Sequence, residues 1–150
     1  MSLDIYVLFK RIRMTDMANK TIVIGAGRMG ASIARYLNEK SNVVIVDRNM
    51  FKIEKLQDYT GFCEVGDATD LQFLEKIGAK EASRVVIVTE DDNVNIFLAD
   101  LFENIIGVKD IYIRLKDSRK RKLVKDSVIC ICPFDLSLNY FENENGKKEA

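Results

Sequence analysis

The residues best suited to chemistry form a glycine-rich loop, Gly25-Ala26-Gly27-Arg28-Met29-Gly30. This G-x-G-x-x-G string directly follows an apolar run and opens an amphipathic stretch, the context in which such a string is informative. The first glycine allows a tight turn, the second lets the backbone approach a pyrophosphate, and the third lets a helix pack closely on a strand. The N-terminus of that helix offers free N–H groups to phosphates. We therefore predict a dinucleotide site; the alternative is that the glycines serve only packing.

Asp47 is a candidate to bind the ribose of the same ligand. It closes the second apolar run, about 20 residues after the loop, which is the usual offset of a ribose-binding acid. Its carboxylate would accept hydrogen bonds from ribose hydroxyls and repel a 2′-phosphate, although the neighbouring Arg48 would soften that repulsion. The pair favours NAD over NADP; the alternative for Asp47 is a plain surface aspartate.

Further candidate contacts stand inside the loop and after two later apolar runs. Arg28 falls where the phosphates should sit, so its guanidinium could pair with phosphate oxygens, or it could be a solvated first-turn arginine. Gly66, Asp67 and Ala68 follow the third run, where backbone groups could line an adenine, or Asp67 could only form a turn. Thr89 ends the fourth run, near the expected switch point of the sheet.

From Lys20 onward, short apolar runs alternate with amphipathic stretches, which is typical of repeated βα units. The apolar runs predict six strands, at Thr21–Ile24, Asn42–Asp47, Phe62–Val65, Arg84–Thr89, Asp110–Arg114 and Ser127–Cys132. Periodicity and capping residues predict helices at about Arg28–Glu39, from Asn49 to Asp58, from a Thr69/Gln72 capping box to Gly78, and over Ser118–Lys125. The longest predicted helix ends near Gly107 and carries one apolar stripe, made of Val94, Phe97, Leu98, Leu101 and Ile105.

This order of elements predicts an α/β fold with one domain. We expect a doubly wound, Rossmann-like sheet of six parallel strands in the order 3-2-1-4-5-6, with helices on both faces. Ligands of such sheets bind at the carboxyl ends of the strands, beside the switch point between strands 1 and 4. The domain is expected over residues 20–141, with a polar, frayed tail at 142–150. Residues 1–19 are expected to be a disordered leader or an arm left by expression, or else a short arm that docks on a partner.

Composition narrows the function classes. With 150 residues, 23 Lys+Arg and 23 Asp+Glu, the chain has the size of one domain and a net charge of +0, which disfavours nucleic-acid binding. The sequence contains 0 histidines, so the usual general base and the commonest metal ligand are both missing. The three cysteines, Cys63, Cys130 and Cys132, lack C-x-x-C spacing, which favours a reduced, cytosolic setting. Cys130 and Cys132 lie two apart in an apolar run, so on a strand they would share a face as small hydrophobes; the alternative is a redox role.

Together these residues resemble the N-terminal nucleotide-binding domain of Trk/Ktr-type regulators of potassium channels and transporters, also called the RCK, KTN or TrkA-N domain. The resemblance covers Lys20 to about Pro133. It rests on the glycine loop with its arginine, on Asp47, on G-D-A-T-D at Gly66–Asp70, on T-x-D-D-x-x-N at Thr89–Asn95, and on Arg114. The glycine loop alone is shared with many dehydrogenases, whereas its combination with the two later motifs is more specific.

The resemblance implies binding of NAD(H), ATP, ADP or AMP. Its ligand contacts would be Gly25, Gly27, Arg28, Asp47, Asp67 and Ala68, with Thr89 and Glu90 near the far end of the ligand. It also implies a homodimer or higher ring that is cytoplasmic, is not inserted in the membrane, and transmits nucleotide state to a membrane potassium transporter or channel subunit. Full-length members often carry a second, C-terminal domain, so a one-domain member and a fragment both remain open.

These residues suit three possible functions unequally. A nucleotide-sensing regulatory module requires binding and no catalysis. An NAD-dependent oxidoreductase, the alternative, must also hold a substrate and supply an acid or base, yet the βα units use almost every residue after Lys20. A purely structural domain leaves Arg28, Asp47 and Asp67 at strand ends unexplained. We therefore expect a sensor and no enzyme.

Overall fold

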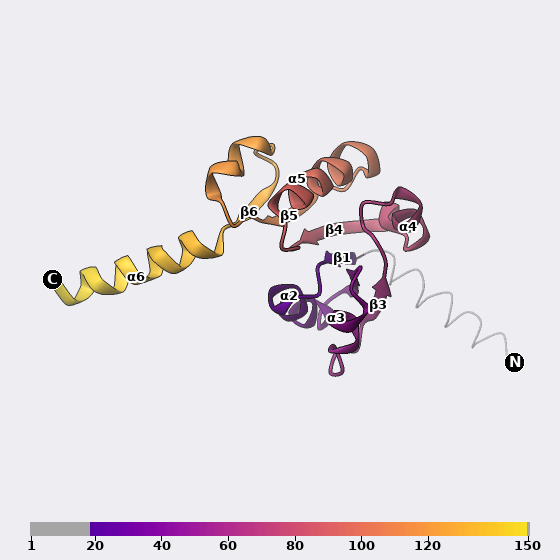
Figure 1. The fold of residues 1–150 in the computed structure, drawn as a ribbon, viewed down its shortest axis with the longest axis horizontal. Coiled ribbons are helices and arrows are strands. Elements are labelled where there is room, and N and C mark those ends of the chain that lie inside the picture. Colours follow the sequence, from indigo (N-terminus) through magenta and orange to yellow (C-terminus); the bar gives the residue numbers. More distant parts are fainter. Residues whose placement is uncertain (1–18, 150) are drawn as a thin grey trace, which may run out of the picture.

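A computed structural model describes residues 19–149 and forms one six-stranded sheet (Figure 1). The strand order is β3-β2-β1-β4-β5-β6, and every neighbouring pair is parallel, so the predicted fold and strand order are confirmed. The strands are β1 (Lys20–Ile24), β2 (Asn42–Asp47), β3 (Phe62–Val65), β4 (Ala82–Ile87), β5 (Asp110–Arg114) and β6 (Ile129–Ile131). The predicted N-terminal arm, apart from residue 19, lies outside the described residues.

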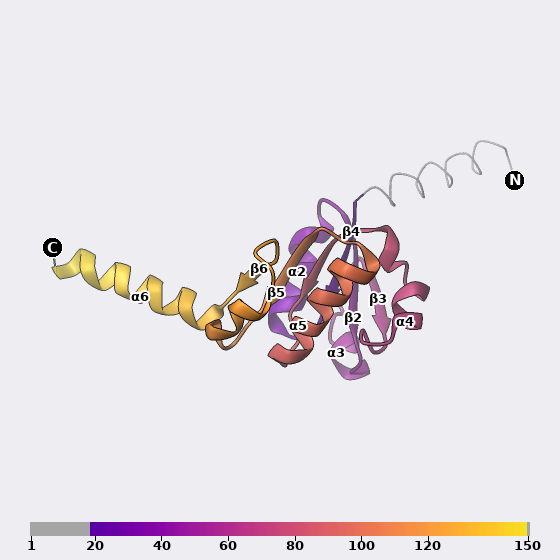
Figure 2. The ribbon, with the colours of Figure 1, turned by 90° about the horizontal axis from the view of Figure 1, so that it is seen from above.

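Helices cover both faces of this sheet (Figures 1 and 2). The α-helices are α2 (Arg28–Asn38), α3 (Met50–Glu54), α4 (Leu71–Lys76), α5 (Asp92–Asp100) and α6 (Pro133–Glu149). Three short helical turns, η1 (Ala79–Glu81), η2 (Leu101–Ile106) and η3 (Ser118–Leu123), complete the connections. Two separate apolar clusters result, one under α4 and α5 and one under α2 and α3.

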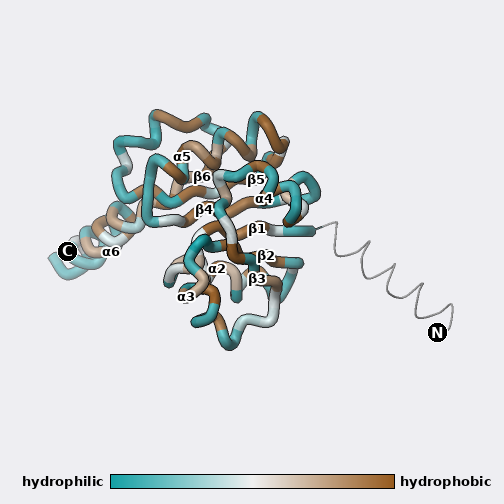
Figure 3. Tube along the Cα trace, turned by 45° about the vertical axis from the view of Figure 1, so that its right-hand side comes forward, coloured by the Kyte–Doolittle hydropathy of each residue, from teal (hydrophilic) through white to brown (hydrophobic). Residues whose placement is uncertain are grey.

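The central strands are apolar on both faces because each face is covered. Along β1, Ile22 and Ile24 enter the cluster under α4 and α5, whereas Val23 enters the cluster under α2. This alternation is the period of two expected of a strand, and burial on both faces is expected of a parallel sheet. Figure 3 shows these apolar strands at the centre of the molecule, with hydrophilic loops around them. The sheet is therefore a rigid base for the loops at its carboxyl edge.

Two helix predictions in the first half of the chain need correction. Helix α3 ends at Glu54 rather than near Asp58; it buries none of its own residues, and the chain turns so that Leu56 reaches the core. Helix α4 is capped by Asp70, whose carboxylate accepts from the backbone of Gln72, and not by Thr69. The hydroxyl and the backbone N–H of Thr69 both donate to the Asp67 carboxylate instead.

The apolar stripe predicted up to Gly107 is only partly correct. Helix α5 ends at Asp100 and continues as the wider turn η2, so the spacing of 3.6 residues no longer holds. Leu98 is buried as predicted, but Phe97 and Ile105 are exposed, and Phe102, which the stripe did not include, is fully buried. The buried face of this segment is therefore rotated relative to the predicted one.

The C-terminal segment differs most from its prediction. Residues 133–149 form α6, which is longer than α5 and projects away from the sheet (Figure 2), so the prediction of a frayed tail is wrong. Pro133 suits the first turn of a helix, where its missing N–H costs nothing. Asp135 in the first turn and Lys147 and Lys148 in the last turn complement the helix dipole. Within residues 19–149, no helix combines the length and apolar character needed to cross a bilayer.

Cys130 and Cys132 lie as predicted for small hydrophobes on one face of a strand. Cys132 is buried in the cluster under α5, and Cys130 packs against the same cluster, so the two share a face. Cys63 lies exposed on the edge strand β3. All three are free thiols.

Candidate functional site

A cavity of about 920 Å³ opens at the carboxyl edge of the sheet, over the switch point between β1 and β4. The structure brings most of the predicted site residues together there. Those that line it are Gly25, Gly27, Arg28, Met29, Asp47, Arg48, Gly66, Asp67, Ala68, Thr89 and Glu90. Ala26 and Gly30, which are both buried, do not line it.

Two glycines of the loop are required by packing. Gly25 adopts a φ of +106°, and a Cβ there would lie 2.8 Å from the carbonyl oxygen of Val88. A Cβ at Gly30 would lie 1.7 Å from the carbonyl oxygen of Gly25, so only glycine lets α2 approach β1 this closely. These two positions shape the turn and do not need a ligand to explain them.

Gly27 differs from both, because a Cβ at this position would meet no protein atom within 4 Å. Its backbone is extended, with φ −71°, a conformation that any residue can adopt. Packing therefore does not require glycine here. A ligand group that closely approaches the backbone from the cavity would require it. The residues fit a phosphate-bearing ligand at this point.

The N-terminus of α2 lacks the side-chain cap that neighbouring helices have. Asn49, Asp70 and Asp91 cap α3, α4 and α5, but Gly27 provides no such group, and the first turn of α2 contains no acid. Its first-turn N–H groups therefore remain available to an anion from the cavity. Arg28 lies exposed at the same point, so a second group suited to phosphate adjoins the first.

Asp47 holds the glycine loop in place. Its Oδ2 accepts a 2.8 Å hydrogen bond from the backbone N–H of Ala26, and its Oδ1 accepts one of 2.8 Å from Asn49. Each carboxylate oxygen can accept a second bond, so the group keeps capacity for ligand hydroxyls. Asp47 therefore has a structural role in the loop and is not the plain surface aspartate that the sequence also allowed.

Asp67 forms a turn and lines the cavity as well. Its Oδ1 accepts from the Thr69 hydroxyl at 2.7 Å and from the Thr69 backbone at 2.9 Å. These hydrogen bonds hold the pKa of Asp67 below its usual 3.8, and the positive charge of Arg48 adds to the effect. The carboxylate is therefore ionised and fixed in direction at the cavity rim.

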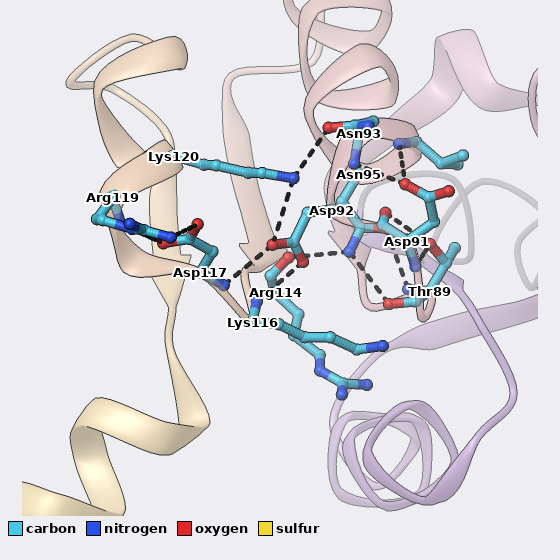
Figure 4. Close-up of polar contacts among 11 residues, drawn as sticks. Thr89, Asp91, Asp92, Asn93, Asn95, Arg114, Lys116, Asp117, Arg119 and Lys120 are labelled. Carbon is cyan, nitrogen blue, oxygen red and sulfur yellow. Dashed lines mark hydrogen bonds and ion pairs between the residues drawn. The ribbon is translucent and has the colours of Figure 1, made fainter.

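Charged and polar side chains connect the elements that surround the cavity. Lys52 of α3 and Glu90, which follows β4, form an ion pair of 3.8 Å, and both line the cavity. Deeper in, Asn95 is fully buried; its Oδ1 accepts from the Thr89 hydroxyl at 2.5 Å, and its amide donates to the carbonyl of Arg114 at 2.9 Å. Asn95 thus ties the carboxyl ends of β4 and β5 together (Figure 4).

The sequence prediction omitted several lining residues. Arg114 at the end of β5 and Pro133 at the start of α6 both line the cavity, as do Lys52, Thr69 and Asp91. Arg114 could have been included, because it ends a strand at the same sheet edge as the predicted residues. Pro133 carried no such signal, since in the sequence it only follows the predicted strand Ser127–Cys132.

Solved structures share this fold. The GsuK channel bound to NAD superposes with a TM-score of 0.73 at 24% identity, covering 87% of this chain and 24% of that chain. The crystal structure of GsuK bound to ADP superposes with a TM-score of 0.71 at 25% identity, covering 88% of this chain and 35% of that chain. The doubly wound sheet is therefore the same architecture in these proteins.

Sequence comparison identifies the family. A Trk system potassium uptake protein TrkA homolog of Pyrococcus horikoshii is 30% identical over 128 residues, which are 79% of this chain and 56% of that protein. This chain thus spans about half the length of that relative. The TrkA-N domain profile matches residues 21–131, from β1 to the end of β6. The chain therefore belongs to the TrkA-N domain family.

Proposed function

We propose that this chain is a regulatory domain that binds NAD(H) or an adenine nucleotide (ATP, ADP or AMP) and controls a potassium channel or transporter. The observation that carries the proposal is Gly27, which faces open cavity at the start of an uncapped helix. Asp47 lies at the end of the adjacent strand β2, so ribose-binding and phosphate-binding groups adjoin each other. Packing alone accounts for Gly25 and Gly30 but not for this combination.

The proposed ligand runs along the carboxyl edge of the sheet. Its adenosine ribose binds Asp47, with the adenine beside Gly66, Asp67 and Ala68. Its phosphates bind the first-turn N–H groups of α2 and the guanidinium of Arg28. Arg48, beside Asp47, reduces the repulsion of a 2′-phosphate without removing it, so NAD is favoured over NADP.

Regulation requires that two ligands favour two conformations by different amounts. The names of the relatives support a potassium pathway as the partner: one is a potassium uptake protein, and GsuK is a channel solved with NAD and with ADP. We propose that the chain acts in the cytoplasm as a homodimer or higher ring, peripheral to the membrane through that partner.

The proposed function needs no catalysis. The sequence contains 0 histidines, and the groups gathered at the cavity are those of a binding site. Oxidation of NADH by this chain with a small carbonyl substrate would instead support the alternative, an NAD-dependent oxidoreductase fragment.

Calorimetric titration with NADH, NAD⁺, ATP, ADP and AMP tests the binding part. We expect at least one of these ligands to bind at submillimolar concentration, and the proposal fails if none does. The regulatory part is tested by deleting the encoding gene and measuring potassium uptake by the cells. We expect altered uptake; unchanged uptake would contradict a role in potassium transport.

A further inference from the structure

Arg114 has a buried donor that the protein itself does not satisfy. The residue ends β5 and lines the cavity, and its Nε has no hydrogen-bond partner within residues 19–149. Nor does its side chain join any ion pair in that part of the chain. Burying a charged donor without a partner is unfavourable, so such a group in a native structure calls for a specific explanation.

The nearby carboxylates are all engaged elsewhere. Asp91 caps α5 through the backbone N–H groups of Asn93 and Val94, and Glu90 pairs with Lys52. Asp92, which is 7% exposed, accepts from the backbone N–H groups of Lys116 at 2.8 Å and Asp117 at 3.0 Å. Figure 4 shows the Arg114 side chain running away from the carboxylates of Asp92 and Asp117. Its charge is therefore left for a group that enters from the cavity.

The backbone that carries Arg114 is fixed from two sides. The buried amide of Asn95 donates to the carbonyl of Arg114 at 2.9 Å. The carboxylate of Asp92 holds the two peptide groups that follow, at Lys116 and Asp117. Both side chains come from the first turn of α5, within the T-x-D-D-x-x-N motif. A guanidinium held on such a support is pre-organised to bind a ligand.

The place of β5 in the sheet indicates which part of the ligand Arg114 meets. In the order β2-β1-β4-β5, it lies two strands beyond the glycine loop and three beyond Asp47. With strands about 4.8 Å apart, Arg114 is about 10 Å beyond the loop, on the side away from the ribose. The first phosphate after the ribose meets α2, and only a longer ligand reaches β5. The neighbouring Val94 and Leu98 are apolar wall residues, which strengthen a charge interaction at this point.

We propose that Arg114 binds the terminal phosphate of a nucleoside triphosphate and makes the cavity distinguish ATP from AMP. This inference rests on the proposed nucleotide-binding function and assigns it a specificity-determining residue. A guanidinium can donate two parallel hydrogen bonds to one phosphate, and it prefers this anion to the nicotinamide of a dinucleotide, which is a cation in NAD⁺ and neutral in NADH. Binding also supplies the missing partner of the buried Nε.

The test compares Arg114→Gln with the wild type by calorimetric titration of AMP, ADP, ATP and NAD⁺. Arg35→Gln is the matched control, because Arg35 is an exposed arginine of α2 that does not line the cavity. We expect Arg114→Gln to lower the affinity for ATP at least about tenfold and the affinity for AMP less than about twofold, as for a lost charge-assisted contact. Arg35→Gln should leave the ratio of ATP to AMP affinity unchanged.

An equal loss for ATP and AMP, no loss for ATP, or a loss for NAD⁺ as large as that for ATP would each overturn the assignment. If the wild type binds neither these four ligands nor NADH, the proposed function itself fails. If it binds them and the ratio does not depend on Arg114, only this inference fails. Should Arg114→Gln not fold, the wild type still gives an answer: ATP, but not AMP, should shift the ¹⁵Nε–H resonance of Arg114. The same shift with both ligands would contradict the proposal.

Discussion

The carboxylate of Asp47 and the backbone N–H of Ala26 are joined by a 2.8 Å hydrogen bond, which ties the end of β2 to the glycine loop that follows β1. The other carboxylate oxygen accepts from Asn49, at the start of α3. One side chain therefore shapes two loops at the cavity before any ligand is present. A substitution of Asp47 should thus reduce both the stability of the fold and the affinity for a nucleotide.

Replacing Asp47 with alanine should lower the free energy of unfolding by about 1.5–3 kcal/mol, the range for hydrogen bonds to a charged group. Urea unfolding measures this loss, and calorimetry should show weaker binding of every adenosine ligand. Asp58→Ala serves as the control, because Asp58 is exposed and does not line the cavity. Unchanged stability of the Asp47 variant would contradict the role of the carboxylate in the loop.

Gly27→Ala and Gly25→Ala form a matched pair with opposite expected effects. At Gly27 the new Cβ occupies open cavity, so the melting temperature should hold while nucleotide affinity falls by about tenfold or more. At Gly25 the positive φ and the contact with Val88 should reduce stability by at least about 1 kcal/mol. Thermal unfolding and calorimetry on both variants give the answer; a Gly27 variant that binds nucleotide normally would count against the phosphate site.

Thr69→Ala should raise the pKa of the Asp67 carboxyl toward its usual 3.8, because the hydroxyl of Thr69 is the main cause of the lowered value. The lowered pKa stabilises the fold above pH 3.8, and this contribution is lost as the pH falls through the folded value. Carbon-13 NMR titration of the Asp67 carboxyl measures the shift. Thr69→Ser, which keeps a hydroxyl, should retain the lowered pKa, and identical titration curves for all three proteins would refute the assignment.

Asn95→Ala should destabilise the fold by about 2–4 kcal/mol, since it leaves buried polar groups at the ends of β4 and β5 without partners. Asn95 is fully buried, with bonds to Thr89 and to the carbonyl of Arg114. The exposed Asn93, two residues earlier, is the control, and Asn93→Ala should cost less than about 1 kcal/mol. Chemical denaturation compares the two, and equal losses would mean that burial of this amide is unimportant.

The centre of the sheet could be predicted from the sequence because β1, β2 and β4 are buried on both faces and therefore form continuous apolar runs. The strand-end rule likewise found Asp47, Asp67 and Thr89, whose positions depend only on where strands end. The buried face of the segment formed by α5 and η2 could not be predicted, because the wide turn η2 changes the residue spacing and no distinctive sequence marks it. Pro133 suits both the end of a strand and the first turn of a helix, so local pattern alone did not reveal α6.

Arg114 illustrates a different limit. Its position at a strand end was visible in the sequence, but whether its guanidinium is paired depends on the side chains packed around it. Asp91, Asp92 and Glu90 are close in sequence to the motif residue Thr89, and any of them could have paired with Arg114. Only the three-dimensional arrangement shows that each is bound elsewhere.

Helix α6 begins at a residue of the cavity wall, Pro133, and continues for 17 residues without burying any of them. At a rise of about 1.5 Å per residue, the helix is about 25 Å long and acts as a lever arm. A tilt of about 10° at Pro133 would displace its far end by about 4 Å. A shift of Pro133 on binding of the proposed ligand would therefore be enlarged at the far end of α6.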